Sequence, residues 1–268
     1  MFCFKKKSWM LILPFILVAC ATESEKVMNE VKNYKPQQIF EKGDYYYQDK
    51  NYPKAIDYFT ALENLYPYGE YAKKGLFELA QAYYYSDQKD LALSSLDTYI
   101  KVYPASESVP NALYLKAIIN YNPDRDFFDR TFKQGAADLD PKGLNEAMLN
   151  YQIIENKYPT SQYESIAVAN IVIIRNELAL SEIYHSAYYM GIKAYVAAVN
   201  RAMVIVTNYP DTDKKEEALA ILVTAYTKLN QPGIANDYRN KLKSEFPGSI
   251  YLIKPWQYKE SKWYSFRR

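Results

Sequence analysis

The chemistry most clearly available to this chain is that of one thiol, the side chain of Cys20. An apolar stretch from Trp9 to Ala19 precedes it, and the basic run Lys5-Lys6-Lys7 precedes that stretch. At eleven residues the stretch is well short of the ~20 that a membrane-spanning helix needs, so it fits the apolar region of a signal peptide. A cysteine that directly follows such a segment can carry a lipid on its sulfur, and we predict that Cys20 does.

Leu17-Val18-Ala19-Cys20 resembles the bacterial lipobox. Such a signal is cut before the cysteine, whose thiol receives a diacylglycerol while its freed amine is acylated. Because stable attachment needs more than one acyl chain, this modification would hold the protein firmly to a leaflet. Ala21, not aspartate, follows the cysteine, and by resemblance to enterobacterial lipoproteins this implies the periplasmic side of the outer membrane. The alternative is an ordinary secretory signal with a chance cysteine.

No other residues have the types and spacing of a catalytic or metal site. His185 is the one histidine, and we expect it to be a packed or surface residue of a helix. Asp138 and Asp140 could bind calcium weakly, but the rest of a calcium-loop pattern is missing, so we expect solvated carboxylates. The sequence has no phosphate loop, metal-spaced Cys/His set or nucleophile elbow. We therefore predict no enzymatic activity, no metal and no cofactor besides the lipid.

The elements that must position any binding site are helices repeated along the chain. Five times, an alanine is followed by residues of one helix face at i+4 and i+7, an aromatic residue at i+11 and then a proline. The copies are Ala55-Phe59-Leu62-Tyr66-Pro67, Ala92-Leu96-Tyr99-Tyr103-Pro104, Ala147-Tyr151-Ile154-Tyr158-Pro159, Ala198-Ala202-Ile205-Tyr209-Pro210 and Ala235-Arg239-Leu242-Phe246-Pro247. With the small and tyrosine residues that precede them, the first copies resemble the tetratricopeptide repeat. We predict an all-α fold, a right-handed α-solenoid of about five helix pairs.

This pattern divides the chain into four parts. They are a cleaved signal peptide (1–19), a lipidated flexible tether (20–34), the repeats (35–247) and an aromatic, basic C-terminal capping segment (248–268). The repeats are 35–69, 70–107, 108–161 with an insertion at about 122–143, 162–212 and 213–247. In the fourth, a long helix from about Tyr163 to Tyr184 is expected ahead of the first helix of the pair. The last segment, which contains Trp256 and Trp263, is expected to form a capping helix; the alternative is that it docks a partner or lipid headgroups.

The charge balance excludes one broad class of function. The formal net charge of +2 falls to about −1 when the three lysines before Cys20 are removed, since no acidic residue precedes Cys20. So nearly neutral a chain has no global electrostatic attraction for nucleic acid.

Aromatic residues on the first helices of the repeats indicate a peptide groove. In tetratricopeptide repeats that helix lines the concave surface, and its positions 5, 9 and 12 point into it. The corresponding residues are Phe40, Asp44, Tyr47, Phe77, Gln81, Tyr84, Tyr114, Ile118 and Tyr121. An aromatic-lined groove suits an extended or partly helical peptide with hydrophobic side chains. The alternative is that these rings pack within the superhelix or against the tether.

The lipobox, tether, repeats, insertion and tail together resemble the BamD (ComL) family, tetratricopeptide-repeat lipoproteins of the outer-membrane β-barrel assembly machinery. The more specific segments are Phe40-Glu41-Lys42-Gly43, Asp138-Leu139-Asp140-Pro141 and Ala194-Tyr195-Val196-Ala197-Ala198-Val199-Asn200-Arg201. The resemblance implies a scaffold that binds unfolded barrel precursors through its N-terminal repeats. It also implies a barrel-forming partner subunit with periplasmic transport-associated domains, other assembly lipoproteins as further partners, and Arg201 as the residue that forms an ion pair with that subunit.

Two alternatives stay open at the level of sequence. The chain could be a tetratricopeptide lipoprotein that pilots a pilus or secretin, or one that coordinates cell-wall synthesis in the periplasm. Arg201, in turn, could be an ordinary exposed arginine of a helix. The tail with its two tryptophans matches nothing in the family pattern.

Overall fold

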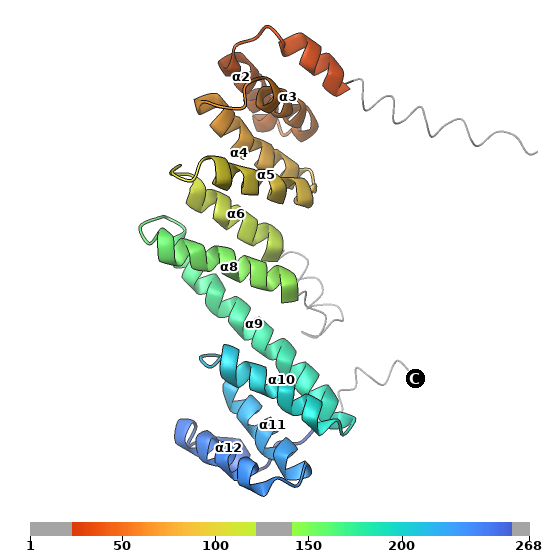
Figure 1. Ribbon diagram of the computed structural model, residues 1–268, viewed down its shortest axis with the longest axis vertical. Helices are drawn as coiled ribbons and strands as arrows, with labels where there is room; N and C mark the ends of the chain where they lie inside the picture. Colours follow the sequence, from red (N-terminus) through yellow and green to blue (C-terminus); the bar gives the residue numbers. More distant parts are fainter. Residues whose placement is uncertain (1–22, 122–140, 259–268) are drawn as a thin grey trace, which may run out of the picture. The chain divides into compact units, whose positions relative to one another are not determined.

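The computed structural model describes residues 23–121 and 141–258, and it divides after Ile119 into two compact units, unit 1 and unit 2. The described residues contain helices and no strand. Besides the helical residues 23–31, the elements are α2 (Pro36–Gln48), α3 (Tyr52–Leu65), α4 (Glu70–Tyr85), α5 (Lys89–Val102), α6 (Val109–Tyr121), α8 (Pro141–Lys157), α9 (Glu164–Gly191), α10 (Tyr195–Asn208), α11 (Lys215–Lys228), α12 (Pro232–Glu245) and the short 3-10 turn η2 (Ile250–Leu252). Within unit 1, α2 to α5 pack against each other in chain order, and within unit 2 α8 to α12 do so, as Figure 1 shows. The all-α solenoid of tetratricopeptide-like helix pairs is thereby confirmed.

The repeated residues form the buried face of the second helix of each pair, as predicted. Those with less than a tenth of their surface exposed are Ala55, Phe59, Leu62, Ala92, Leu96, Tyr99, Ala147, Tyr151, Ile154, Ala198, Ala202, Ile205, Ala235 and Leu242. The departure at Arg239 is exposed, so the last copy has a narrower apolar face. Each of these helices ends two residues before its proline, which cannot continue the hydrogen-bond ladder.

The turns inside the helix pairs share one backbone feature. Lys50, Asp87, Lys193 and Asn230 have φ values of 59°, 58°, 63° and 58°, and each lies between the two helices of its pair. A left-handed residue at this place reverses the chain within a few residues. Four of the pairs are therefore built on the same short turn, even where the first helix departs from the repeat pattern; the connection between α6 and α8 lies outside the described residues.

The helices of unit 1 approach closely where glycines lie at the contact between them. A Cβ atom added at Gly43 of α2 would lie 2.5 Å from Cε1 of Phe59, whose ring is buried in α3. One added at Gly75 of α4 would lie 2.7 Å from Cδ2 of Leu62. Small residues thus let α2, α3 and α4 pack around these two side chains.

The expectation of a flexible tether over 20–34 is wrong for its described part. Residues 23–31 are helical, and Val31 is fully buried against Ile39 and Tyr58. Glu30 of this segment accepts hydrogen bonds from Lys42 Nζ at 2.6 Å and from the Tyr58 hydroxyl at 3.0 Å. The apolar residues of the segment lie on one face among polar neighbours, so the overall polarity that suggested a tether conceals a packed helix.

Unit 2 differs from the expected pattern in its first helices. The long helix expected ahead of the fourth repeat and the first helix of that repeat are one continuous helix, α9, because Glu164–Met190 contains no glycine or proline to interrupt it. The expected insertion at 122–143 ends earlier, since Pro141 begins α8. Cys20, Asp138, Asp140 and Trp263 lie outside the described residues.

The last described segment does not form the expected capping α-helix. Residues 249–258 contain only the short turn η2, followed by irregular backbone, although Trp256 is buried against the core of unit 2. Proline at position 255 disfavours helix for the preceding residue and removes a backbone donor.

Candidate functional site

The residues predicted to line a groove form two groups in unit 1: one lies around Tyr47 and Gln81, and the other consists of two phenylalanines packed between helices. Tyr47 of α2 and Gln81 of α4 meet, with the tyrosine hydroxyl donating to Oε1 of the glutamine at 3.3 Å. Around them lies what we call the tyrosine cluster: Tyr47, Tyr52, Tyr84 and Tyr85. Its ring centroids are 5.8 Å apart for Tyr47 and Tyr52, 5.1 Å for the stacked pair Tyr52 and Tyr85, and 5.4 Å for Tyr84 and Tyr85.

The tyrosine cluster is an exposed surface with a partly buried base. Burial, assisted by nearby tyrosines, raises the pKa of Tyr47, so its hydroxyl stays protonated and keeps its hydrogen bond to Gln81. Tyr85, by contrast, has 54% of its surface exposed. An exposed ring held in place by stacking offers a contact area that loses little entropy on binding. The sequence pattern missed Tyr52 and Tyr85, which do not occupy the groove positions of the repeat.

The two phenylalanines of the prediction pack between helices. The ring of Phe40 lies 6.0 Å from that of Phe59 and 5.7 Å from that of Tyr71. The ring of Phe77 lies 5.4 Å from that of Tyr99 on α5. The structure therefore does not bring all predicted aromatics into one continuous row.

Phe77 also lines a hollow beside α4, which we call the α4 hollow. It has a volume of about 460 Å³ and is bounded by α4, by α5 and by the segment that leads to α6. Its lining residues are Glu70, Lys73, Lys74, Phe77, Glu78, Tyr99, Ala105, Ser106, Glu107 and Ser108. A hollow with aromatic walls and both signs of charge can accept a side chain while offering partners to polar groups of a peptide.

Glu78 is the electrostatically unusual residue of the α4 hollow. Burial, with a smaller contribution from the charge of Asp44, raises the pKa of Glu78 from 4.5 to about 7. Its Oε2 atom is buried and, among the described residues, has no hydrogen-bond partner. A carboxyl group with an unused buried oxygen can accept a donor from a ligand, and when protonated it can donate to a carbonyl.

One face of α4 connects the hollow with the tyrosine cluster. Lys74, Glu78, Gln81 and Tyr85 follow one another at helical spacing along that face. Eleven residues of helix rise about 16 Å, which is the length of roughly five residues of extended chain. Asp44 of α2 lies near the same face, since its negative charge contributes to the raised pKa of Glu78. We call this surface the α4 face.

The remaining predicted groove residues lie on α6. Tyr114 is half-buried within unit 1. Tyr121 belongs to unit 2, where its hydroxyl donates to Oε1 of Glu177 on α9 at 3.2 Å. Neither residue is part of the α4 face.

Arg201, the predicted partner-docking residue, lies on the exposed side of α10. Its side chain is 44% exposed, and Nη1 lies 3.5 Å from Oε1 of Glu182 on α9. At that distance and exposure the contact is weak, of the order of a few tenths of a kcal/mol. A carboxylate of another protein can therefore compete for Arg201 at little cost.

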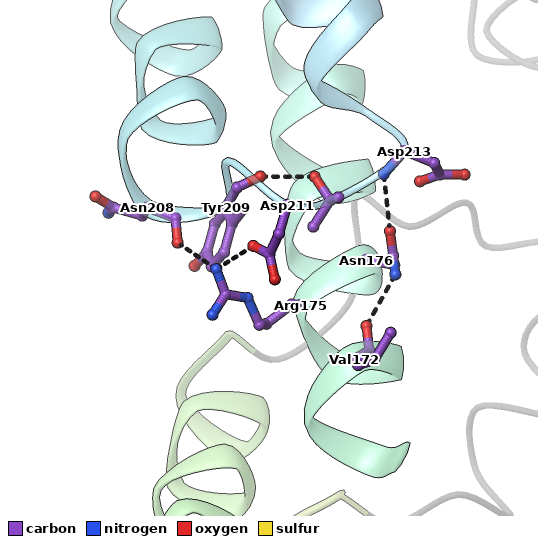
Figure 2. A network of polar contacts seen from close by, with 8 residues as sticks. Val172, Arg175, Asn176, Asn208, Tyr209, Asp211 and Asp213 are labelled. Atoms are coloured by element: carbon purple, nitrogen blue, oxygen red, sulfur yellow. Dashed lines mark hydrogen bonds and ion pairs between the residues drawn. The ribbon is translucent and has the colours of Figure 1, made fainter. Parts of the chain in front are cut away.

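A network that the sequence pattern did not indicate fixes the end of α10 against α9, as Figure 2 shows. Nη2 of Arg175 donates to the carbonyl of Asn208 at 3.3 Å and also pairs with Asp211. The backbone N–H of Asp213 donates to Oδ1 of Asn176 at 3.3 Å. Because these bonds join the middle of α9 to the turn after α10, they set the orientation of the helix that carries Arg201.

The described residues provide little else for chemistry. His185 is half-buried on α9. No group of three or more His, Cys, Asp or Glu residues within 23–121 and 141–258 is arranged to hold a metal ion. Over the same ranges, no helix combines the length and the apolar character needed to cross a bilayer.

Comparisons with known proteins point to one family. The family model described as "YfiO: Outer membrane lipoprotein" matches residues 32–242. A protein of Neisseria meningitidis named "Outer membrane protein assembly factor BamD" is 32% identical over 256 residues, which cover 95% of this chain and 96% of that protein. Proteins of the same name from Xylella fastidiosa and Vibrio cholerae are 29% and 26% identical; the alignments cover 92% and 80% of this chain and 84% and 87% of theirs.

Proposed function

Because this chain belongs to the YfiO family of outer membrane lipoproteins, we propose that it is an assembly factor for outer-membrane β-barrel proteins. It acts as a scaffold and not as an enzyme: Cys20 carries the lipid anchor, unit 1 binds unfolded precursors, and unit 2 docks the barrel-forming subunit. The anchor places the helix pairs on the periplasmic side of the membrane, where both ligands are found.

The observation that carries precursor binding is the α4 face, where exposed stacked tyrosines adjoin the α4 hollow. An unfolded barrel strand alternates apolar and polar residues, so its aromatic side chains point to one side every second residue. One such ring can stack on Tyr85 while another enters the hollow beside Phe77. Meanwhile the carboxyl group of Glu78 can bond to the strand backbone, whose groups are not yet paired with neighbouring strands before the barrel forms.

A photoreactive amino acid at position 85 tests this proposal directly in growing cells. We expect crosslinks from position 85 to unfolded barrel precursors, and none above background from position 45. Tyr45 is the matched control because it is another exposed tyrosine of unit 1, at 66% exposure, but its ring contacts Tyr46 and lies outside the tyrosine cluster and the α4 hollow. Equal crosslinking from both positions would mean that the α4 face has no special role.

For docking of the barrel-forming subunit, Arg201 is the residue we select. The charge reversal Arg201→Glu places a carboxylate beside Glu182 of the same chain. It should reduce co-purification of the subunit about tenfold or more, because a like-charge contact with the subunit replaces the proposed ion pair. Lys241→Glu, at an exposed position on α12, changes net charge equally and serves as the control. If both variants retain the subunit, Arg201 does not contact it.

A further inference from the structure

The segment 249–258, which we call the strap, crosses unit 2 after the last repeat. It begins with Ser249, whose hydroxyl oxygen accepts from the backbone N–H of Tyr251 at 3.3 Å. It then passes along α11 and reaches the end of α9, where the ring of Tyr258 lies against Gly191. The strap therefore contacts the first helices of the last two pairs, which are separated from it by up to 67 residues in the sequence.

Trp256 anchors the strap through three independent contacts. Its side chain is 7% exposed and packs into the main hydrophobic cluster of unit 2. Its indole N–H donates to Oε1 of Glu217 at 2.9 Å, and its backbone carbonyl accepts from the hydroxyl of Thr224 at 3.3 Å. Glu217 and Thr224 are seven residues apart on α11, two helical turns along the same face.

The ring of Tyr258 packs separately, against Gly191 at the end of α9. A Cβ atom at Gly191 would lie 2.8 to 3.0 Å from three carbons of the Tyr258 ring, so a larger residue there would displace the ring. Trp256 is buried and the ring of Tyr258 lies against Gly191 with 38% of its surface still exposed, whereas Gln257 between them is exposed and makes no such contact. This alternation is that of an extended peptide which presents every second side chain to a surface.

The rest of the strap is only partly packed: Tyr251 and Leu252 lie against the core cluster of unit 2, whereas the residues around them are exposed. Ile253 is 89% exposed and Ile250 is 63% exposed, and Lys254 and Pro255 are also exposed. A structural helix at the end of a repeat array would bury a continuous apolar face. The strap instead is attached by separate side chains, those of Tyr251, Leu252, Trp256 and Tyr258, and by a few hydrogen bonds.

We propose that the surface formed by Glu217, Thr224 and Gly191 is a recognition slot for extended peptides with the pattern Trp-x-Tyr, and that the chain fills this slot with its own residues 256–258. This slot in unit 2 is separate from the α4 face, and the inference does not depend on precursor binding there. A tethered ligand acts at an effective concentration in the millimolar range, so it excludes weak external peptides until it is released. The strap is thus a built-in competitor for the slot.

The first test uses the full mature chain and a fluorescein-labelled synthetic peptide of residues 250–258. With the slot vacated by Trp256→Ala, fluorescence anisotropy should show binding about tenfold or more tighter than to the wild-type chain, the ratio expected when a millimolar competitor faces a dissociation constant near 100 μM. Adding Glu217→Ala should remove the gain, and so should replacing the tryptophan of the peptide by alanine. Equal affinity for the wild-type chain and the Trp256→Ala chain, including no binding to either, overturns the proposal.

A second variant keeps the test decisive if Trp256→Ala impairs folding. A protease site inserted between Ile253 and Lys254, where the strap is exposed, allows cleavage of the otherwise unchanged full chain after folding. Circular dichroism should show the helices intact, and the labelled peptide should then bind and be displaced by its unlabelled copy. A cleaved, folded chain that releases its terminal fragment and still binds no peptide contradicts a recognition slot, because the strap would then be a structural cap alone.

Discussion

The ionised form of Glu78 should lower the free energy of unfolding at neutral and higher pH, because the carboxylate is partly buried. Its pKa of about 7 means that the folded state binds a proton more tightly than the unfolded state, where the ordinary value is 4.5. Between those two values, stability falls as the pH rises, and the contribution of protonated Glu78 is lost once the pH has passed through about 7. Above that, the folded protein holds an ionised, partly buried carboxylate.

The size of the effect follows from the pKa difference. Complete conversion would give roughly 3 kcal/mol, at about 1.4 kcal/mol for each pH unit. Because Glu78 is only partly buried, solvent screening reduces the expected effect to about 1–2 kcal/mol. Glu78→Gln keeps the shape and removes the charge, so we expect the variant to be more stable than the wild type by about that amount at pH 8.

Urea unfolding of both proteins at pH 5 and pH 8, followed by circular dichroism, measures this difference. The advantage of Glu78→Gln should shrink by about 1–2 kcal/mol at pH 5, where the wild-type carboxyl group is protonated in the folded state. Glu63→Gln, at an exposed position on α3, removes one carboxylate in the same way and is the control for the loss of a surface charge. An advantage that is equal at both pH values, or a variant less stable at pH 8, would refute the assignment of a buried carboxylate with a raised pKa.

Two further substitutions test the packing and the helix contacts. Gly43→Ala places a Cβ atom 2.5 Å from buried Phe59 and should cost about 1–3 kcal/mol, lowering the thermal midpoint by several degrees. Gly233→Ala, which meets no atom within 4 Å, should leave the midpoint unchanged or raise it, and equal effects at the two glycines would contradict the tight packing. Arg175→Ala should lower the free energy of unfolding by about 1 kcal/mol through loss of its bonds to Asp211 and the end of α10, measured by urea titration. If that variant is as stable as the wild type, the network of Figure 2 does not hold α10 in place.

The second helices of the pairs were predictable because their signal is local. Ala55, Phe59 and Leu62 lie within two turns of one helix, and apolar residues at that spacing need a buried face whatever the partner. The proline after each copy marks the helix end for an equally local reason. Repetition of the pattern then indicated that similar helix pairs follow one another.

The features that the sequence did not reveal depend on contacts between distant residues. Val31 is buried only because Ile39 and Tyr58 cover it, and its own surroundings in the sequence are polar. The raised pKa of Glu78 depends on packing beside α4 and on Asp44 of another helix. A helix pattern marks Glu78 as a residue of α4 but contains no information about its burial.

The residues of α9 themselves indicated one continuous helix, but the repeat pattern indicated two. The segment contains no helix breaker, yet the repeat pattern suggested that a long helix ends at about Tyr184, ahead of the first helix of the fourth pair. Ser186 is instead fully buried within α9, and its hydroxyl donates to the carbonyl of Ala198 at 2.8 Å. A buried hydroxyl with a partner on the next helix supports packing in mid-helix as well as at a helix start.

The measurement that most directly tests the central claim is affinity purification of the lipidated protein from outer membranes, followed by identification of the proteins that co-purify. The account predicts a β-barrel subunit with repeated periplasmic domains, retained by the wild-type protein and depleted by Arg201→Glu. Recovery of a secretin or of cell-wall synthases, with no such barrel subunit, would contradict the assembly function.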